Sequence, residues 1–140
     1  MKQPTKSVVL VDDDQAYADL MVEILSHNLD CPVVSFTRPL EALAALPLLA
    51  PSVIVTDYNM PQLNGLEFIR QAVPLAPHAA VVVMTGHDLT FARDEMDRLG
   101  ALKGFLEKPF GSRQLAAEII RVWPEKGAPA PEHRRRPARA

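Results

Sequence analysis

Acidic, hydroxyl and ammonium side chains follow four short apolar runs of this 140-residue sequence. Asp12 and Asp13 come after the first of these runs and Asp57 after the second, while Thr85 and Lys108 follow the last two. If a fold gathers three carboxylates within ~5 Å, each pair repels by roughly 3 kcal/mol at an effective dielectric of about 20. A folded protein keeps such a cluster ionised only by supplying positive charge.

The residue types indicate which positive charge and which reaction suit this set. Hard oxygen ligands, with no His or Cys among them, select Mg²⁺ (or Mn²⁺) over zinc or copper. Lys108 would be the second cation, and an ammonium opposite a metal-bound carboxylate suits a phosphoryl group. Thr85 adds a hydroxyl donor, and Gly86 removes a side chain where a ligand would approach. The expected chemistry is attack of an Asp57 carboxylate oxygen on phosphorus, which gives a mixed anhydride.

Strands and helices alternate in the expected secondary structure. Short apolar runs rich in β-branched residues are typical of strands buried on both faces, and apolar residues spaced three and four apart are typical of helices. This alternation predicts an α/β fold with a parallel sheet covered on both faces, in which ligands bind beyond the carboxyl ends of the strands. The polar residues fall at that edge. The expected strands are 7–11, 32–36, 52–56, 79–85 and 102–107, and the expected helices begin after Asp14 and cover 37–46, 65–73, 88–100 and 111–123.

Cap residues and apolar spacing predict where the helices begin and which faces point inward. Asp14, Thr37 and Ser112 are the expected N-caps, and Gly100 suits a left-handed C-terminal stop. The residues expected to face the core are Tyr17, Leu20, Met21, Ile24 and Leu25 in the first helix, Leu40, Leu43 and Ala44 in the second, and Leu115, Ile119 and Val122 in the last.

Composition places the chain among soluble globular proteins of one domain. Apolar residues make up 48% of the chain and charged residues 23%. The single cysteine, Cys31, excludes an internal disulfide framework and a thiolate zinc cluster. The first residues do not read as a signal peptide, and the longest apolar stretch is broken by two prolines and is too short to span a bilayer. A soluble cytoplasmic protein is therefore expected.

The C-terminal segment 124–140 differs from the rest in charge and composition. It carries a net charge of +3 and four prolines, against a net charge of −5 for residues 1–123. Without large apolar residues it cannot bury enough surface to offset its ordering entropy. We therefore expect a disordered Pro/Arg-rich tail or linker after a folded domain of residues 5–123. Its arginine run is interpreted as solvated, with contact to an acidic partner or nucleic acid as the alternative.

Four motifs occur in a fixed order along the chain, VLVDDD, VIVTDYNMPQLNG, VVVMTG and GFLEKPF. On these motifs, residues 5–123 resemble the receiver domains of two-component response regulators, the CheY-like family. The resemblance implies a flavodoxin-like, five-stranded parallel sheet in the order 2-1-3-4-5 with helices on both faces. It also implies a signalling phosphoprotein that catalyses only its own phosphorylation and dephosphorylation.

The resemblance further implies a role for each site residue. Asp57 would be the phosphoacceptor, and Lys108 would pair with the phosphoryl group. The Lys108–Pro109 peptide bond would be cis, which proline permits. Because the first two acids match the metal pair of the family, Asp14 is interpreted as a helix cap. The metal ligands would be Asp12, Asp13, Asp57 and the backbone carbonyl of Asn59.

Signal output is expected to depend on Thr85 and Phe105. The Thr85 hydroxyl would move to meet a phosphoryl oxygen, and the vacated space would let Phe105 turn inward. That movement would change the surface made by the fourth helix, the fifth strand and the fifth helix. A purely structural Phe105, packed as a core aromatic, is an equal alternative. Asn59 and His87 would tune how fast water removes the phosphoryl group.

Partners follow from the same resemblance. The phosphodonor would be a phosphohistidine of a histidine kinase or phosphotransfer protein, and the output would go to a downstream protein. Phosphorylation-dependent homodimerisation is left open, and no membrane partner is expected. A DNA-binding output is not expected of this chain, because the 17 residues after Trp123 are too few for an output domain of ~50 residues or more.

Two other classes of function compete with this reading. A metal-dependent phosphohydrolase also forms an aspartyl phosphate, but such an enzyme needs a substrate pocket and usually a second acid as proton donor. No further acid closely follows Asp57, and no long cap insertion is visible. A pseudo-receiver that only binds partners would not need the complete set of acids, hydroxyl and ammonium that the sequence carries.

Overall fold

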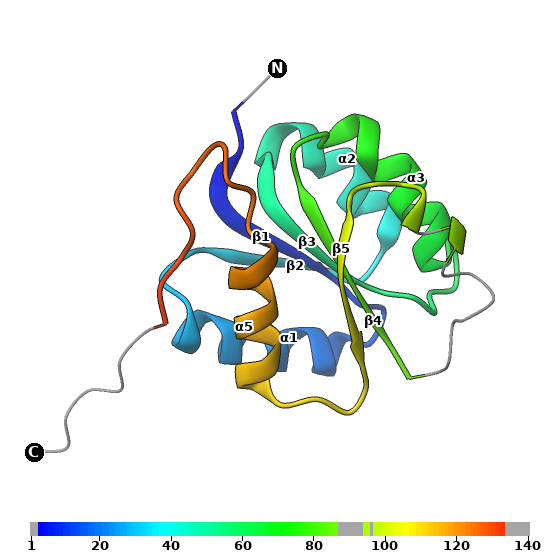
Figure 1. Ribbon diagram of the computed structural model, residues 1–140. Helices are drawn as coiled ribbons and strands as arrows, with labels where there is room; N and C mark the ends of the chain where they lie inside the picture. Colours follow the sequence, from blue (N-terminus) through cyan, green and yellow to red (C-terminus); the bar gives the residue numbers. More distant parts are fainter. Residues whose placement is uncertain (1–2, 87–93, 96, 134–140) are drawn as a thin grey trace, which may run out of the picture.

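The computed structural model describes residues 3–86, 94–95 and 97–133. Its centre is a five-stranded sheet in which every neighbouring pair of strands is parallel, in the order β2-β1-β3-β4-β5 (Figure 1). This order is the one that the sequence predicted. The strands are β1 Thr5–Val11, β2 Val33–Phe36, β3 Pro51–Asp57, β4 Ala80–Thr85 and β5 Leu102–Glu107.

Helices cover both faces of the sheet, as expected. Figure 1 shows α1 and α5 on one face and α2 and α3 on the other. The helix expected over 88–100 lies mainly outside the described residues, and Gly100 at its end has the left-handed φ of 67° that a glycine stop requires. The labelled helices are α1 Gln15–Asn28, α2 Pro39–Leu49, α3 Gly65–Leu75 and α5 Ser112–Val122.

The core is divided by the sheet into two apolar clusters, one under each helix layer. Because side chains alternate between the two faces of a strand, Val9 and Ile54 pack toward α2 and α3, while Val8 and Val55 pack toward α1 and α5. Every residue of β3 and β4 is buried. The two central strands that carry Asp57 and Thr85 are therefore fixed by packing on both faces.

The predicted helix caps are correct at α1 and wrong at α2 and α5. The Asp14 side chain accepts a hydrogen bond from the Tyr17 N–H at 3.1 Å, as an N-cap does. At α2 the N-cap is Arg38 rather than Thr37, and no side chain caps it. The reason is steric, since a proline at the first helical position keeps the residue before it extended. Ser112 is the first residue of α5, and the N-cap is Gly111.

The predicted inward faces are partly wrong. Leu20 and Leu40 are 50% and 52% exposed, and Ala44 is also exposed. The side chains that face the sheet instead include Ala18 and Ala42, which are fully buried. The spacing of apolar residues predicts that a helix has an apolar face, but it does not predict which residues lie at the middle of that face.

Residues 124–133, which belong to the segment expected to form a disordered tail or linker, make contacts with the rest of the domain. The Trp123 indole N–H donates to the Ala128 carbonyl at 2.8 Å. Farther along, the Glu132 N–H donates to the Asp30 carboxylate at 2.8 Å, and Leu29 forms an isolated antiparallel bridge with His133. Residues 134–140 of this segment lie outside the described residues.

Within the residues that the structure describes, no helix has the length and apolar character needed to span a bilayer.

The segment between β3 and α3 folds back so that its last part contacts Tyr58, the residue after Asp57. The Gly65 N–H donates to the Tyr58 carbonyl at 2.6 Å. A Cβ atom added at Gly65 would lie 2.9 Å from the Tyr58 Cα, which is closer than real Cβ contacts allow. Glycine is therefore required here, because no side chain fits between the two backbone segments. Its small size allows the backbone to close against Tyr58, the residue after Asp57.

Replacing this glycine is expected to destabilise the domain. Gly65→Ala should lower the free energy of unfolding by roughly 1–3 kcal/mol, because the atom that must move is backbone. Urea unfolding followed by circular dichroism measures the change. Gly86→Ala is the matched control and should stay within about 0.5 kcal/mol of the wild type, since no described atom lies within 4 Å of its added Cβ. Equal losses in both variants would contradict this explanation.

Candidate functional site

The register of the sheet brings the polar residues predicted from sequence to one edge. Val11 pairs with Thr56, so Asp12, the next residue after β1, is level with Asp57 at the end of β3. Thr85 pairs with Glu107 at the ends of β4 and β5, so Lys108 follows directly at the same edge. The convergence expected from a parallel sheet is therefore present in the structure.

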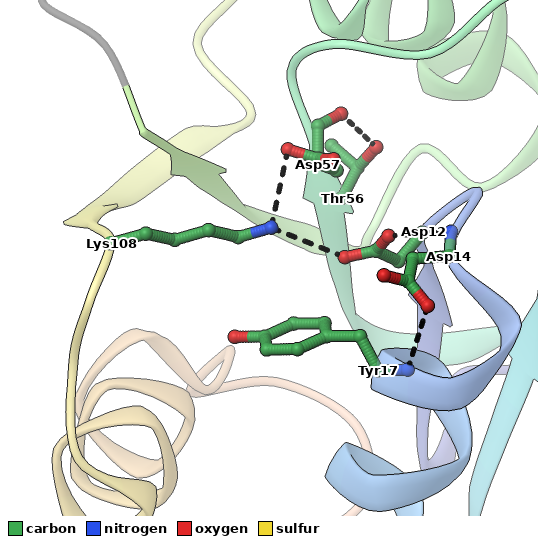
Figure 2. Close-up of polar contacts among 6 residues, drawn as sticks. All are labelled: Asp12, Asp14, Tyr17, Thr56, Asp57 and Lys108. Atoms are coloured by element: carbon green, nitrogen blue, oxygen red, sulfur yellow. Dashed lines mark hydrogen bonds and ion pairs between the residues drawn. The ribbon is translucent and has the colours of Figure 1, made fainter.

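Three carboxylates form a cluster at this edge. Ligand oxygens of Asp12, Asp13 and Asp57 all lie within 4.8 Å of one another. Asp12 is 1% exposed and Asp57 is 8% exposed, whereas Asp13 is on the surface. Asp12 is oriented by the Asp14 N–H, which donates to its carboxylate at 3.0 Å. Asp14 itself is outside the cluster and acts as the α1 cap (Figure 2).

The ammonium of Lys108 faces two of these carboxylates. Its Nζ lies 3.3 Å from Asp12 Oδ2 and 3.7 Å from Asp57 Oδ1 (Figure 2). The Lys108 backbone N–H donates to the Thr85 carbonyl at 2.6 Å, which fixes the start of the side chain at the end of β4. The Lys108–Pro109 peptide bond is cis, as predicted.

Burial and charge act in opposite directions at this site. Burial raises the pKa of Asp57, and the neighbouring Asp12 and Asp13 raise it further, while the Lys108 ammonium opposes the shift. For Lys108, burial alone would lower the pKa, but the charges of Asp12 and Asp57 and the hydrogen bond to Asp12 outweigh it, so the pKa is raised. The lysine therefore stays charged beside a carboxyl group whose pKa is raised.

Tyr17 is a site residue that sequence reasoning assigned only to the core. Its ring centroid lies 4.5 Å from Lys108 Nζ, within the range of a cation–π contact. Burial raises the pKa of its hydroxyl, with Lys108 opposing the shift and the acids supporting it. The sequence did contain one signal for this role. Tyr17 lies in the first turn of the helix that directly follows the acidic motif, and a residue in that turn must lie near the acids.

The remaining predicted residues lie at the same edge or near it. Thr85 is fully buried at the end of β4, while Gly86 and Asn59 are exposed. Phe105 is half-buried and pairs with Val83, so its side chain and that of Thr85 lie on the same face of the sheet. His87, predicted to tune dephosphorylation, lies outside the described residues.

The donor set of the cluster fits a hard divalent cation. All three groups are carboxylates, and among the described residues no His or Cys belongs to the cluster. Oxygen ligands of this kind suit Mg²⁺ or Mn²⁺. A cation held by this cluster, together with the Lys108 ammonium, would supply the charges needed to receive an anionic oxygen group at Asp57.

Comparison with known proteins identifies the family of this chain. The response regulator receiver domain family matches residues 8–120. The transcriptional regulatory protein FixJ of Azorhizobium caulinodans is 37% identical over 137 residues, which cover 95% of this chain and 61% of that protein. The transcriptional regulatory protein CreB of Escherichia coli is 30% identical over 118 residues, or 81% of this chain and 49% of that protein. The chain thus spans about half to three-fifths of these two relatives.

A solved structure supports the same assignment. The chemotaxis protein CheY4 of Vibrio cholerae superposes with a TM-score of 0.77 at 25% identity, covering 84% of this chain and 98% of that one. The family match and this CheY-like neighbour favour a receiver domain over the phosphohydrolase considered from the sequence. With its acidic cluster at the edge of a parallel sheet in the order β2-β1-β3-β4-β5, the chain belongs to the response regulator receiver domain family of two-component signalling.

Proposed function

We propose that this receiver domain accepts a phosphoryl group on Asp57 from a phosphohistidine of a sensor kinase or phosphotransfer protein. The observation that carries the proposal is the position of the Asp57 carboxylate, which lies within 4.8 Å of ligand oxygens of Asp12 and Asp13 and 3.7 Å from the ammonium of Lys108. Phosphorylation would then alter a surface that a downstream protein recognises. A protein of this kind would act in the cytoplasm, where its kinase has access to ATP.

The transfer itself is a displacement at phosphorus. A carboxylate oxygen of Asp57 forms a bond to phosphorus while the bond from phosphorus to the donor imidazole nitrogen breaks. The nitrogen keeps the electron pair, and the product on the receiver is an acyl phosphate. Asp57 presents this oxygen from the end of a fully buried strand, so its orientation is fixed before the donor arrives.

A divalent cation fits the acids beside Asp57. We infer that Asp12, Asp13, Asp57 and the backbone carbonyl of Asn59 hold Mg²⁺ or Mn²⁺. When bound, the ion would neutralise the carboxylates and the phosphoryl oxygens. Lys108 would leave Asp57 to pair with a phosphoryl oxygen and would remain close to Asp12. The open space around Gly86 would admit the phosphoryl group.

Signal output would pass through β4 and β5. The Thr85 hydroxyl would turn toward a phosphoryl oxygen, and Phe105, on the same face of the sheet, would repack in response. We infer that the affected surface is formed by the segment around 94–100, β5 and α5, and that a protein partner or a second copy of the chain binds there. Asn59 and His87 would set the lifetime of the phosphoryl group.

Phosphorylation of the purified chain is the direct test. Incubation with acetyl phosphate and Mg²⁺ should add one phosphoryl group per chain, and intact mass spectrometry should detect it. Asp57→Asn should abolish the addition because the amide cannot replace the nucleophilic carboxylate. Asp94→Asn, a carboxylate outside the site, is the control and should be labelled like the wild type. Continuous turnover of the donor as a substrate, without accumulation of label, would instead favour the phosphohydrolase.

Cation binding can be tested by calorimetry without phosphorylation. Asp13→Asn should weaken Mg²⁺ binding at least about tenfold, because it removes a charged ligand from the cluster. Asp14→Asn is the matched control, since asparagine also caps helices and Asp14 is outside the cluster. Equal Mg²⁺ affinity in both variants would argue against these ligands.

The proposed role of Thr85 in output predicts a separation of two activities. Thr85→Ala should still be phosphorylated, but the gain in partner or self-association upon phosphorylation should fall roughly tenfold, since the hydroxyl that responds to the phosphoryl group is gone. A pull-down or sedimentation experiment on phosphorylated and unphosphorylated protein measures this gain. An undiminished gain in Thr85→Ala would reject the switch and leave Phe105 as a packing residue.

A further inference from the structure

The Lys108 ammonium has an aromatic neighbour as well as two acidic ones. Its Nζ lies 4.5 Å from the centroid of the Tyr17 ring, 3.3 Å from Asp12 Oδ2 and 3.7 Å from Asp57 Oδ1. Figure 2 shows the ring on one side of the ammonium and the two carboxylates on the others. The charged group therefore lies against an aromatic ring and two acids, and the Lys108 side chain as a whole is 27% exposed.

The ring is held by the same short segment that carries the first acids. The Tyr17 N–H donates to the Asp14 carboxylate at 3.1 Å, and the Asp14 N–H donates to the Asp12 carboxylate at 3.0 Å. The start of α1 thus fixes the Tyr17 backbone relative to the Asp12 carboxylate. Tyr17 is half-buried in this position, and its ring also packs against the apolar cluster under α1 and α5.

We propose that Tyr17 is a positioning residue for Lys108, whose ring face holds the ammonium against Asp12 and Asp57, ready to meet a phosphoryl oxygen. A lysine has a flexible four-carbon stem and loses considerable rotamer freedom when its ammonium is confined. The ring confines it by electrostatic attraction to its face, which needs the aromatic system and not the hydroxyl. The inference rests on the proposed phosphorylation of Asp57 and adds a residue outside the four sequence motifs.

Substitutions at Tyr17 separate the aromatic ring from mere bulk. Tyr17→Leu keeps an apolar side chain of good helix propensity but removes the ring, so the rate of phosphorylation by acetyl phosphate and Mg²⁺ should fall roughly three- to tenfold. Tyr17→Phe keeps the ring and should stay within about twofold of the wild type. Leu20→Ala, an exposed position one turn along α1, is the control and should leave the rate unchanged.

A double-mutant cycle shows whether Tyr17 acts through Lys108. In a Lys108→Met background, Tyr17→Leu should have little further effect on the rate, because the ammonium that the ring positions is already absent. A loss as large as in the wild-type background would overturn the inference, since it would mean that Tyr17 supports the site by packing alone.

An independent readout uses NMR and no phosphodonor. The ε-methylene protons of Lys108 should show an upfield ring-current shift in the metal-free wild type and in Tyr17→Phe, and should lose it in Tyr17→Leu. Absence of this shift in the wild type, or equal phosphorylation rates for wild type and Tyr17→Leu, would overturn the role of Tyr17. A wild type that acetyl phosphate does not label would instead overturn the proposed function, and the two failures are thereby distinguished.

Discussion

The attraction between the Lys108 ammonium and the carboxylates of Asp12 and Asp57 is the interaction on which the site depends. Two opposite charges 4 Å apart attract by about 4 kcal/mol at an effective dielectric of 20. This attraction is comparable with the repulsion between two neighbouring carboxylates of the cluster. Removing the ammonium would leave Asp57 beside Asp12 with no nearby positive charge from the protein to oppose the burial that raises the Asp57 pKa. In the proposed function, Lys108 and a bound cation would together favour the ionised, nucleophilic form of Asp57.

The sheet is what allows these charges to meet. Asp12, Asp57 and Lys108 are far apart in the sequence, and no helix or turn could bring them within a few ångströms by itself. Parallel strands in register can, because each strand presents its carboxyl end at the same edge. Because every residue of β3 and β4 is buried, packing on both faces fixes the strand ends that carry Asp57 and Thr85.

Most of this arrangement could be predicted from the sequence because it rests on strong local signals. Apolar β-branched runs identify buried strands, and the residue after each run must then fall at the common edge. The position of Asp12, Asp57 and Lys108 at that edge is therefore predictable from the sequence. The contact between Tyr17 and Lys108 could not be predicted, because it depends on how far α1 lies across the sheet and on the rotamers of two long side chains. Likewise, the need for glycine at position 65 follows from a backbone approach to Tyr58 that no spacing rule encodes.

The errors in helix detail have a similar physical origin. Thr37 has the right chemistry for a cap, but Pro39 restricts the residue before it and moves the cap to Arg38. Leu20 and Leu40 are apolar and correctly spaced, yet they are exposed, whereas Ala18 and Ala42 of the same helices are fully buried. Capping and packing are decided by neighbours in space, which single-sequence patterns describe only on average.

The contacts of residues 124–133 have a consequence for α5. At the C-terminal end of α5 the Trp123 indole is hydrogen-bonded to Ala128. The chain then runs back toward the turn between α1 and β2 (Figure 1), where the Glu132 N–H donates to Asp30. At its other end α5 begins at Ser112, only a few residues after Lys108. If the loop that carries Lys108 moves, we therefore expect α5 to tilt about its C-terminal end, where Trp123 is held. Displacement would consequently be greatest in the turn nearest the site and smallest at Trp123.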